Sequence, residues 1–416
     1  MRRLFWGRWT SAAPLCVGVT LAVASCGRLG FDGVGPEGET EPGGTQVVVN
    51  APVSSFSTSS RTFVDVPSGA LTISPAAGET WLVLLSARLG STSLGQESVE
   101  ARFLVDGVEQ GLSGVGNEAV NAGGAWMHFT ALRGAGAPVT IQVQLRDVDG
   151  AATIDSLRML AARLPRDADP YLASVDVAVA TAASWTGLAR INLQPATPGD
   201  YLVLAEATGR ESPCTTGGVG VRVQTDRGEL WPALTTAFPN RVTSYQGVSR
   251  TTRVGFSLAR RVSLSGPASF ELQARSGDAV GCDVTNVRMI AFRTDGFADV
   301  ASTEELAEVS VADADGAVIS SLTVPGGSDA RYLVVQSFTM SSAAPGLGER
   351  RATFRANGAE VAAYTHAMDN ENYRAPYGVF YLLEAPAATV LESTCASGTP
   401  GVTVMAKESV IHALRL

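Results

Sequence analysis

The sequence predicts an all-β protein of three tandem antiparallel β-sandwich domains behind an export signal and a flexible tether. The first observation is a repeat, because three similar segments follow one another about 120 to 130 residues apart: LRMLAARL (157–164), VRMIAFRT (287–294) and SVIHALRL (409–416). The second is that apolar and polar residues alternate with a period of two, while almost no segment has a helical period. The length of 416 residues suits two to four domains.

Each repeat begins with the same order of signals. A short strand ends in proline, in LTISP (71–75), INLQP (191–195) and SLTVP (321–325). An aromatic-led apolar strand follows, in WLVLLSA (81–87), YLVLAEA (201–207) and YLVVQSF (332–338). The next strand alternates and ends at residues that accept a positive φ, which tight hairpin turns require: Asp106-Gly107, Asp226-Arg227-Gly228 and Asn357-Gly358.

The second half of each repeat is predicted as a long polar loop and two further strands. The penultimate strand is VTIQVQL (139–145), FELQA (270–274) or TVLES (389–393), and the repeated segment closes the domain. Only residues 302–309 could form a helical turn. Many short strands between turns are typical of a sandwich or a barrel.

The aromatic-led strand, the closing strand and the domain length resemble jelly-roll domains of the tumour-necrosis-factor and complement globular-head type. The resemblance covers each repeat in outline and includes no diagnostic motif, and an immunoglobulin-like sandwich is the alternative. The predicted domains are residues 51–164, 170–294 and 300–416. Because the resembled domains often form trimers, three copies on short linkers could build a pseudo-threefold assembly; three domains in a row are the alternative.

The N-terminus has the pattern of an export signal. Arg2, Arg3 and Arg8 precede an apolar run that ends in Val23-Ala24-Ser25-Cys26. This ending resembles the lipobox of bacterial lipoproteins, which implies a signal peptide over residues 1–25 and a lipidated Cys26. A lipid anchor on an exported bacterial protein follows, and Gly27 favours the outer membrane. Residues 26–50, rich in Gly, Pro and Glu, are predicted as a tether.

Charge and cysteine content exclude some partners. The formal net charge is −9, with no basic run after the N-terminus, which disfavours nucleic-acid binding. Cys214 and Cys282 fall in loops of one repeat, and in an oxidising compartment we predict a disulfide between them. Cys395 is left over, and we favour an inert thiol over an inter-domain or intermolecular bond. The spacings match no zinc site, and no metal or cofactor is expected.

No catalytic constellation is found. The histidines are His128, His366 and His412, and none stands with a nucleophile and a carboxylate at matching repeat positions. His412 occupies the position of Leu160 and Ile290 in the closing strand. The richest loop combines acidic, amide and aromatic side chains, which suit a sugar or peptide ligand: Asp369, Asn370, Glu371, Asn372, Tyr373 and Tyr377.

These observations favour a non-catalytic, lipid-anchored cell-surface protein with an adhesion, structural or partner-binding role. The alternative is a carbohydrate-binding surface protein, and an extracellular hydrolase is a third hypothesis. The expected partners are the membrane, through the anchor, and a surface glycan or protein.

Overall fold

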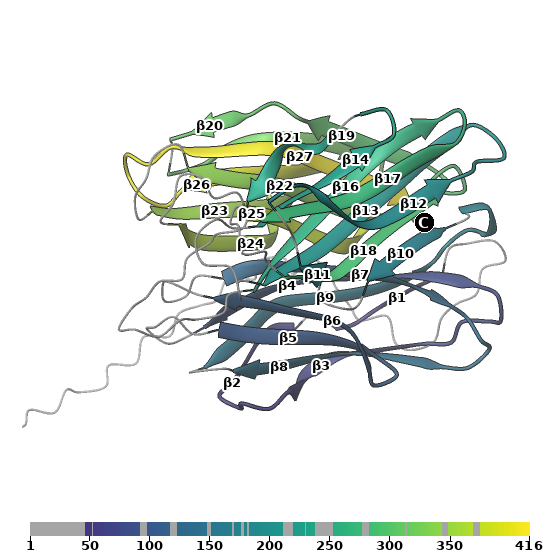
Figure 1. The fold of residues 1–416 in the computed structure, drawn as a ribbon, viewed down its shortest axis with the longest axis horizontal. Helices are drawn as coiled ribbons and strands as arrows, with labels where there is room; N and C mark the ends of the chain where they lie inside the picture. Colours follow the sequence, from purple (N-terminus) through teal and green to yellow (C-terminus); the bar gives the residue numbers. More distant parts are fainter. Residues whose placement is uncertain are drawn as a thin grey trace, which may run out of the picture. The chain divides into compact units, whose positions relative to one another are not determined.

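The computed structural model describes residues 46–416 apart from 52, 92–97, 117–122, 148–150, 169, 176–178, 181–182, 211–218, 229, 238–252, 277–282, 313, 343–347 and 369–374. All of these residues belong to one compact unit. They form six antiparallel sheets, which pair into three sandwiches that follow one another along the chain (Figure 1).

The first repeat contains nine strands: β1 (Val47–Val49), β2 (Val53–Thr58), β3 (Val64–Ile73), β4 (Thr80–Ser91), β5 (Ser98–Val105), β6 (Val108–Gly116), β7 (Gly123–Arg133), β8 (Val139–Asp147) and β9 (Ala152–Arg163). A single turn of 3₁₀ helix, η1 (Arg166–Ala168), leads into the second repeat. Both β1 and β2 pair with β9, so they act as one interrupted strand.

The second and third repeats each contain nine strands in the same order as the first. The second contains β10 (Tyr171–Val175), β11 (Val179–Ala180), β12 (Thr186–Leu193), β13 (Gly199–Arg210), β14 (Val219–Thr225), β15 (Leu230–Ala237), β16 (Arg253–Leu264), β17 (Ala268–Ser276) and β18 (Asp283–Arg293). The third contains β19 (Val300–Glu305), β20 (Val309–Val311), β21 (Ala317–Val324), β22 (Arg331–Ser342), β23 (Gly348–Ala356), β24 (Ala359–Met368), β25 (Ala375–Glu384), β26 (Thr389–Ser397) and β27 (Val404–Arg415).

Strand order identifies each sandwich as a jelly roll. If the interrupted first strand counts as one, each repeat has eight strand positions. Positions 1-8-3-6 form one sheet, here called the inner sheet, and positions 2-7-4-5 form the outer sheet. Two such four-stranded sheets, with consecutive strands passing between them, are the jelly-roll arrangement. The order is the same in all three repeats, which confirms the predicted all-β jelly-roll class and excludes the immunoglobulin-like alternative.

The predicted hairpin turns are present between positions 4 and 5. Asp106 and Gly107 have φ of 48° and 77°, and Asn357 and Gly358 have 48° and 77°, as a two-residue turn with both φ positive requires. In the second repeat this loop is one residue longer, and among the turn residues that the structure describes Gly228, with φ of 82°, is the one with a positive φ. The turn chemistry read from the sequence is therefore confirmed.

A β-bulge that recurs in all three repeats was not predicted from the sequence. Position 8 carries a β-bulge against position 3 in every repeat, and the bulged residues Ser156, Asn286 and Glu408 have φ of 52°, 50° and 54°. These residues are chemically unlike and none is glycine, so the bulge follows from the fold and leaves no common sequence signal.

Each inner sheet is buried on both faces. One face packs against its own outer sheet to form the sandwich core. The opposite face contributes to a fourth cluster, here called the shared core, which draws residues from all three repeats. Corresponding positions meet there, including Leu82, Leu202 and Leu333 from position 3 and Ala162, Phe292 and Leu414 from position 8.

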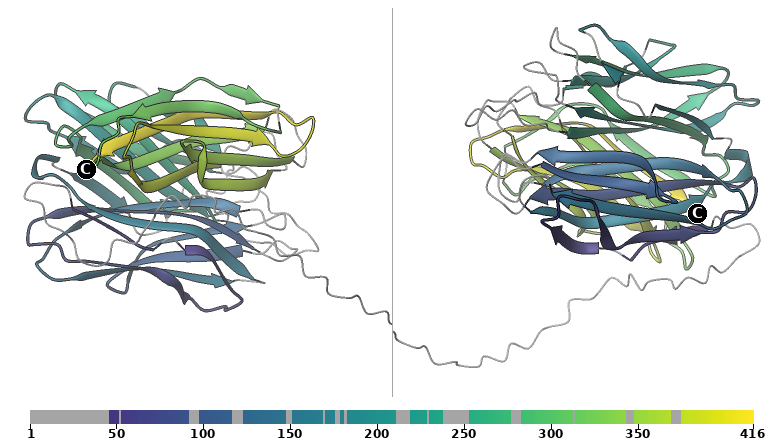
Figure 2. Two further views of the ribbon diagram at one scale, coloured as in Figure 1. Left: turned by 180° about the vertical axis from the view of Figure 1, so that it is seen from behind. Right: turned by 60° about the horizontal axis from the view of Figure 1, so that its bottom comes forward.

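The three repeats close into a ring of contacts. The position-6 strand β7 lies against β16 and β18 of the second repeat, β16 lies against β22 and β27 of the third, and β25 returns to β4 and β9 of the first. We call these the first, second and third seams. Each repeat contacts the next in the same head-to-tail way, and the third contacts the first. Subunits of a cyclic trimer are arranged in this way, and here the three units belong to one chain. This finding favours the pseudo-threefold arrangement over three domains in a row (Figure 2).

The short linkers take part in this arrangement. Ala168 of η1 and Phe297, which follows β18, are both buried in the shared core. A Cβ on Gly296 would lie 2.4 Å from Oδ1 of Asp167, so the two linkers touch each other. The predicted contact between neighbouring repeats is thus confirmed.

Three sequence interpretations are corrected. The segment 302–309 contains the end of β19 and the start of β20, which pair with β27, because pairing at the sheet edge overrides a weak local preference. The predicted long polar loop contains the position-6 strands β7, β16 and β25. Strand β1 (Val47–Val49) lies inside the predicted tether and pairs with β9.

Candidate functional site

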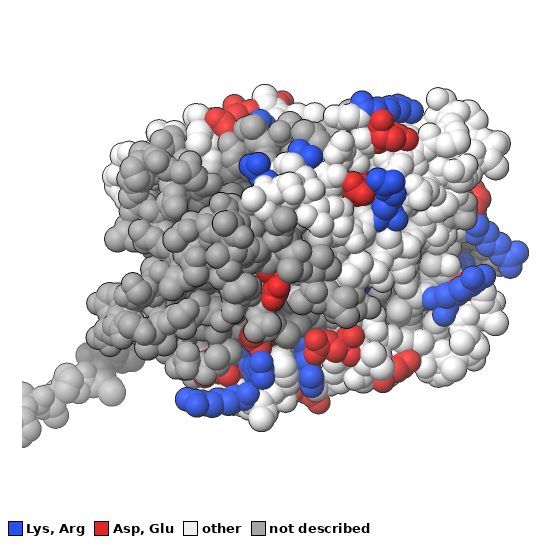
Figure 3. All heavy atoms as spheres, in the orientation of Figure 1, with Lys and Arg blue, Asp and Glu red and all other residues white. Residues whose placement is uncertain are grey.

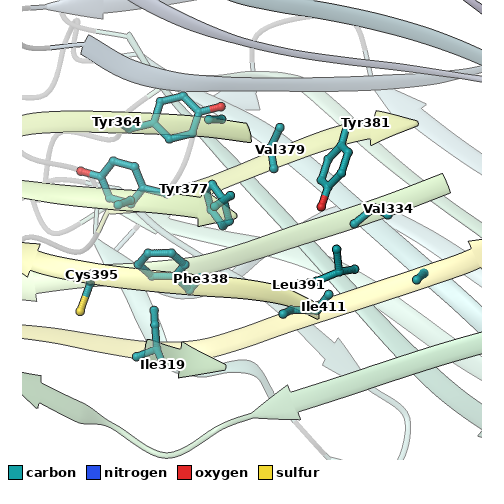
Figure 4. Packing of buried hydrophobic residues seen from close by; sticks show 14 of the residues in the cluster. Ile319, Val334, Phe338, Tyr364, Tyr377, Val379, Tyr381, Leu391, Cys395 and Ile411 are labelled. Carbon is teal, nitrogen blue, oxygen red and sulfur yellow. The ribbon is translucent and has the colours of Figure 1, made fainter. Parts of the chain in front are cut away.

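The predicted ligand-binding loop joins β24 to β25. Asp369, Asn370, Glu371, Asn372 and Tyr373 lie outside the described residues. Tyr377 lies on β25 and is 1% exposed, with its ring 6.1 Å from Tyr364 and 6.2 Å from Phe338 (Figure 4). Its assignment to an accessible loop is therefore wrong: it is a core residue of the third sandwich.

The predicted lipidation and disulfide residues, Cys26, Cys214 and Cys282, also lie outside the described residues. The strand ends next to the two loop cysteines are paired, because Arg210 lies opposite Asp283 in the inner sheet of the second repeat. Cys214 follows the first of these residues by four positions and Cys282 directly precedes the second. The disulfide stays a prediction.

Cys395 is a buried free thiol on β26, in the core of the third sandwich. Burial raises its pKa to about 12. Because the thiolate is the reactive form of cysteine, this thiol is inert in the folded protein, as the sequence interpretation favoured.

We expect a thiol-specific alkylating reagent at neutral pH to leave Cys395 unmodified until the third sandwich unfolds. The measurement is peptide mapping by mass spectrometry after brief labelling in native buffer and in denaturant, with the Cys395→Ala variant as the blank. Rapid modification in native buffer would contradict the assignment of this thiol to the core.

The first seam is held by a buried cluster of charged side chains. One carboxylate oxygen of Glu206 on β13 lies 2.8 Å from Nδ1 of His128 on β7, and the other accepts a hydrogen bond from the backbone N–H of Phe129, at 3.2 Å. Arg288 on β18 lies 3.0 Å from Nε2 of His128 and 3.5 Å from the Glu206 carboxylate. All three side chains are at most 5% exposed.

The donors and acceptors of this cluster define the state of the histidine. A guanidinium only donates, so Nε2 of His128 accepts from Arg288, and Nδ1, which lies 2.8 Å from the Glu206 carboxylate, carries the proton. The imidazole is then neutral, and Arg288 balances Glu206. A buried, charge-balanced cluster that joins two sandwiches positions them against each other, and its carboxylate does not face solvent.

The second seam uses different residues. Arg260 on β16 donates to Glu304 on β19 at 2.9 Å and lies 3.8 Å from Glu408 on β27. His412 lies 3.8 Å from Glu304 and is 1% exposed. Burial lowers the pKa of His412 to about 4; Arg260 and Arg261 act in the same direction, and Glu304 and the Ala259 backbone oppose it.

The third seam contains no such ion pair among its described residues. The Ser86 hydroxyl donates to the carbonyl of Phe380 at 3.1 Å, and Arg158 donates to the carbonyl of Val361 at 2.5 Å. A Cβ on Gly378 would lie 2.2 Å from the sulfur of Met127 and 2.9 Å from the backbone oxygen of Gln336, so glycine fits the close approach of β25 to β7 at this point. The three seams are therefore chemically distinct, although the strands that form them correspond.

The outer sheet of the first repeat carries an aromatic–arginine cluster on its solvent face. The guanidinium carbons of Arg102 and Arg146 lie 4.3 and 4.6 Å from the ring centre of Phe63, just before β3. Carboxylates neutralise both arginines, since Arg146 pairs with Glu100 and Arg102 lies 3.6 Å from Glu109.

The second repeat has the same cluster at corresponding positions. Trp185, just before β12, lies 4.0 Å from the guanidinium carbon of Arg222 and 4.9 Å from that of Arg275. Nε of Arg222 donates to Gln273 at 2.9 Å, as Arg102 does to Gln144 at 2.7 Å. In the third repeat the positions of the two arginines are occupied by Thr353 and Ala396. This cluster was not predicted, although its arginines stand at corresponding places in the alternating strands of the first two repeats.

The described residues contain neither a group of side chains that could hold a metal ion nor a helix that could cross a membrane. Within the ranges given above, no three or more His, Cys, Asp or Glu side chains are grouped so that they could hold a metal ion. No helix in the same residues is long and apolar enough to cross a membrane.

Comparison with known proteins was made by sequence and by structure. No family model matches the chain, and no curated protein sequence matches it. Among solved structures, a recombinant N-glycanase F (PNGase F) is 11% identical, with 59% of this chain and 96% of that chain covered and a TM-score of 0.29. PNGF-II is 7% identical, with 79% and 98% covered and a TM-score of 0.30.

A third similar structure is an archaeal virus protein described by its triple jelly-roll fold and turret assembly. It is 12% identical, with 87% of this chain and 90% of that chain covered and a TM-score of 0.20. TM-scores of this size carry no argument about function.

Proposed function

We propose that this chain is a non-catalytic, lipid-anchored cell-surface protein that binds a surface partner. The observation that carries the proposal is the ring of three jelly rolls. The ring buries the inner sheets in the shared core and leaves the outer sheets and the two ends of the sandwiches for contact with other molecules. The buried charged clusters at the first and second seams hold the sandwiches together.

The two ends of each sandwich differ in a way that supports this role. In the first repeat, antiparallel pairing places the tight turn at Asp106-Gly107 at one end and the β4–β5, β6–β7 and β8–β9 connections at the other. The second and third repeats follow the same strand order. The connections at that second end differ most in sequence between repeats, including the segment 369–374. Variable connections on a rigid sandwich are the usual place for recognition.

The anchor is the part of the proposal that a single substitution tests. In a Gram-negative host, the full chain is expected to incorporate a fatty-acid label and to fractionate with the outer membrane, and Cys26→Ala is expected to lose both. Each buried CH₂ contributes about 0.8 kcal/mol to membrane binding, so loss of the acyl chains releases the protein. A Cys26→Ala protein that stays labelled and membrane-bound would disprove lipidation at this residue.

Carbohydrate binding is the second candidate function, because the outer sheets of two repeats carry partly exposed arginine and aromatic side chains. A glycan array probed with the purified full chain separates the two candidates. Binding to a defined glycan favours the second candidate, and binding only to a protein of the host or a neighbouring cell favours the first.

A further inference from the structure

The outer sheet of the second repeat differs from its counterpart in the first repeat by one carboxylate. Glu100 lies directly opposite Arg146 in the first repeat, and Gly220 lies directly opposite Arg275 in the second. Glu100 forms an ion pair with Arg146, whereas neither Arg222 nor Arg275 has a carboxylate within ion-pair distance among the described residues. The second repeat therefore holds the same pair of arginines without the group that neutralises it.

Among the residues that the structure describes, the outward face of this sheet is positively charged around the pair. Outward-facing described residues of this sheet include three arginines and one glutamate: Arg190, Arg222, Arg275 and Glu271. The glutamate is already engaged, because it accepts hydrogen bonds from Arg190 at 2.9 Å and from the Gln273 amide at 2.5 Å. Partial burial lowers the pKa of Arg222, and the nearby positive charge of Arg275 lowers it further.

The geometry prepares the pair for an anion. Stacking on Trp185 occupies the faces of both guanidinium groups. The Nε and Nη2 groups of Arg222 donate to Gln273 and Gln224, so its Nη1 group and the N–H edge of Arg275 are left for a ligand. Gln273 fixes Arg222 through its Nε, because the amide oxygen accepts from Arg222 and the amide nitrogen donates to Glu271. Planar guanidinium edges held in a fixed orientation are suited to two-oxygen groups such as carboxylate and sulfate.

We propose that the surface formed by Trp185, Arg222 and Arg275 binds a carboxylate or sulfate group of an acidic polysaccharide. The net charge of −9 disfavours a densely charged polyanion such as nucleic acid. Among the described residues on the face shown in Figure 3, acidic and basic side chains lie scattered in small groups and form no broad basic patch. Charges spaced along a sugar chain suit a single arginine pair, and the indole of Trp185 suits the apolar face of a sugar beside it.

This inference rests on the proposed binding role and is independent of the anchor and of the connections at the sandwich ends. Labelling and fractionation of the Cys26→Ala variant test the anchor. Binding of polysaccharide in solution tests this surface alone, so the two failures are distinguishable.

The experiment is calorimetric titration of the purified full chain with oligogalacturonate, a sparsely sulfated κ-carrageenan oligosaccharide and neutral dextran. We expect binding to at least one of the two acidic probes, weakening as salt is added, and none to neutral dextran; the acidic probe that binds identifies carboxylate or sulfate as the ligand group. Arg275→Gln is expected to weaken binding about fivefold to tenfold, as loss of one charge-assisted contact does. Arg275 is exposed, so this variant should fold.

The first repeat supplies matched controls. Gly220→Glu installs the carboxylate of the first repeat and is expected to weaken binding as much as Arg275→Gln does. Glu100→Gly removes that carboxylate and is expected to add a second, weaker site, weaker because Glu109 remains near Arg102. If Gly220→Glu fails to fold, Arg275→Gln and Glu100→Gly still test whether this surface binds the acidic polysaccharide.

Three results would overturn the proposal. The first is no binding of either acidic polysaccharide. The second is binding that Arg275→Gln leaves unchanged. The third is equally strong, equally Arg275-dependent binding of polyglutamate, which would reassign the surface to an acidic peptide.

Discussion

Replacing Glu206 with leucine is expected to lower the free energy of unfolding by about 3 to 5 kcal/mol, the usual cost of removing one partner from a buried ion pair. The side chain is 5% exposed, lies 2.8 Å from Nδ1 of His128 and 3.5 Å from Arg288, and accepts a hydrogen bond from the Phe129 backbone. Without it, Arg288 keeps its positive charge in the seam next to a histidine that has lost the carboxylate beside it. The measurement is equilibrium denaturation in urea, followed by tryptophan fluorescence and circular dichroism.

The chain offers controls for this result. Arg351→Ala removes an exposed ion pair with Glu360, whose side chains are 52% and 49% exposed, and should change the free energy by less than about 1 kcal/mol. The triple variant His128→Leu, Glu206→Ser, Arg288→Val installs the corresponding residues of the second seam, Leu258, Ser337 and Val410. It should recover much of the loss, because replacing a whole buried cluster leaves no charge unpaired.

A loss below about 1 kcal/mol in Glu206→Leu would show that the cluster does not stabilise the seam. A full loss in the triple variant would show instead that the charged residues are needed for the first seam in particular. In that case, the different chemistry of the three seams would specify which sandwich packs against which, as charged groups do at other interfaces.

The fold was predictable from the sequence where local chemistry and tertiary structure agree. The turns at Asp106-Gly107 and Asn357-Gly358 need a positive φ at both positions, so residues that tolerate it mark the hairpins. The strands of position 4 have one face in the sandwich core and one in solvent, so Val221 and Val223 alternate with Arg222. A period of two is then visible.

The position-6 strands were missed because both of their faces are partly buried. Phe129 on β7 points into the shared core, and its neighbour His128 points to the edge of its own sandwich and the first seam. Strand β25 places Phe380 in the shared core and Tyr381 in the core of the third sandwich. Burial on both sides removes the alternation by which a strand is recognised.

The charged clusters could not be read from the sequence for a different reason. His128, Glu206 and Arg288 belong to two repeats and meet only when the ring closes. Nothing in the local pattern of any one of them distinguishes it from a surface residue. The outer-sheet cluster, by contrast, was within reach, because Arg102 and Arg222 stand at the same place in corresponding strands.

His412→Leu is expected to remove a pH dependence from the stability of the protein. The pKa of this histidine is about 4 in the folded protein, below its ordinary value of 6.5. Between these values the unfolded chain binds a proton that the folded chain does not, so the free energy of unfolding falls as the pH falls from 6.5 to 4. The difference between the two pKa values corresponds to roughly 3 kcal/mol when the window has been crossed.

The residues at the corresponding positions of the other two repeats show why leucine is a suitable replacement for His412. His412 lies opposite Val335 in the inner sheet, where the other repeats place Leu160 opposite Leu84 and Ile290 opposite Leu204. All of these residues lie at the shared core, so an aliphatic side chain completes a layer that is apolar in the other two repeats. At neutral pH the variant should be at least as stable as the wild type, since it buries no polar ring.

The measurement is urea denaturation of both proteins at several pH values from 7.5 to 4, and the quantity compared is the difference between their free energies of unfolding. Carboxylates that titrate in the same range cancel in that difference, apart from Glu304, which lies 3.8 Å from the histidine. Glu304→Gln, combined with each form of residue 412, isolates its share as a double-mutant cycle. A difference that stays constant over the whole range would mean that His412 takes up its proton equally in the folded and unfolded chains, and so is not held neutral by burial at the second seam.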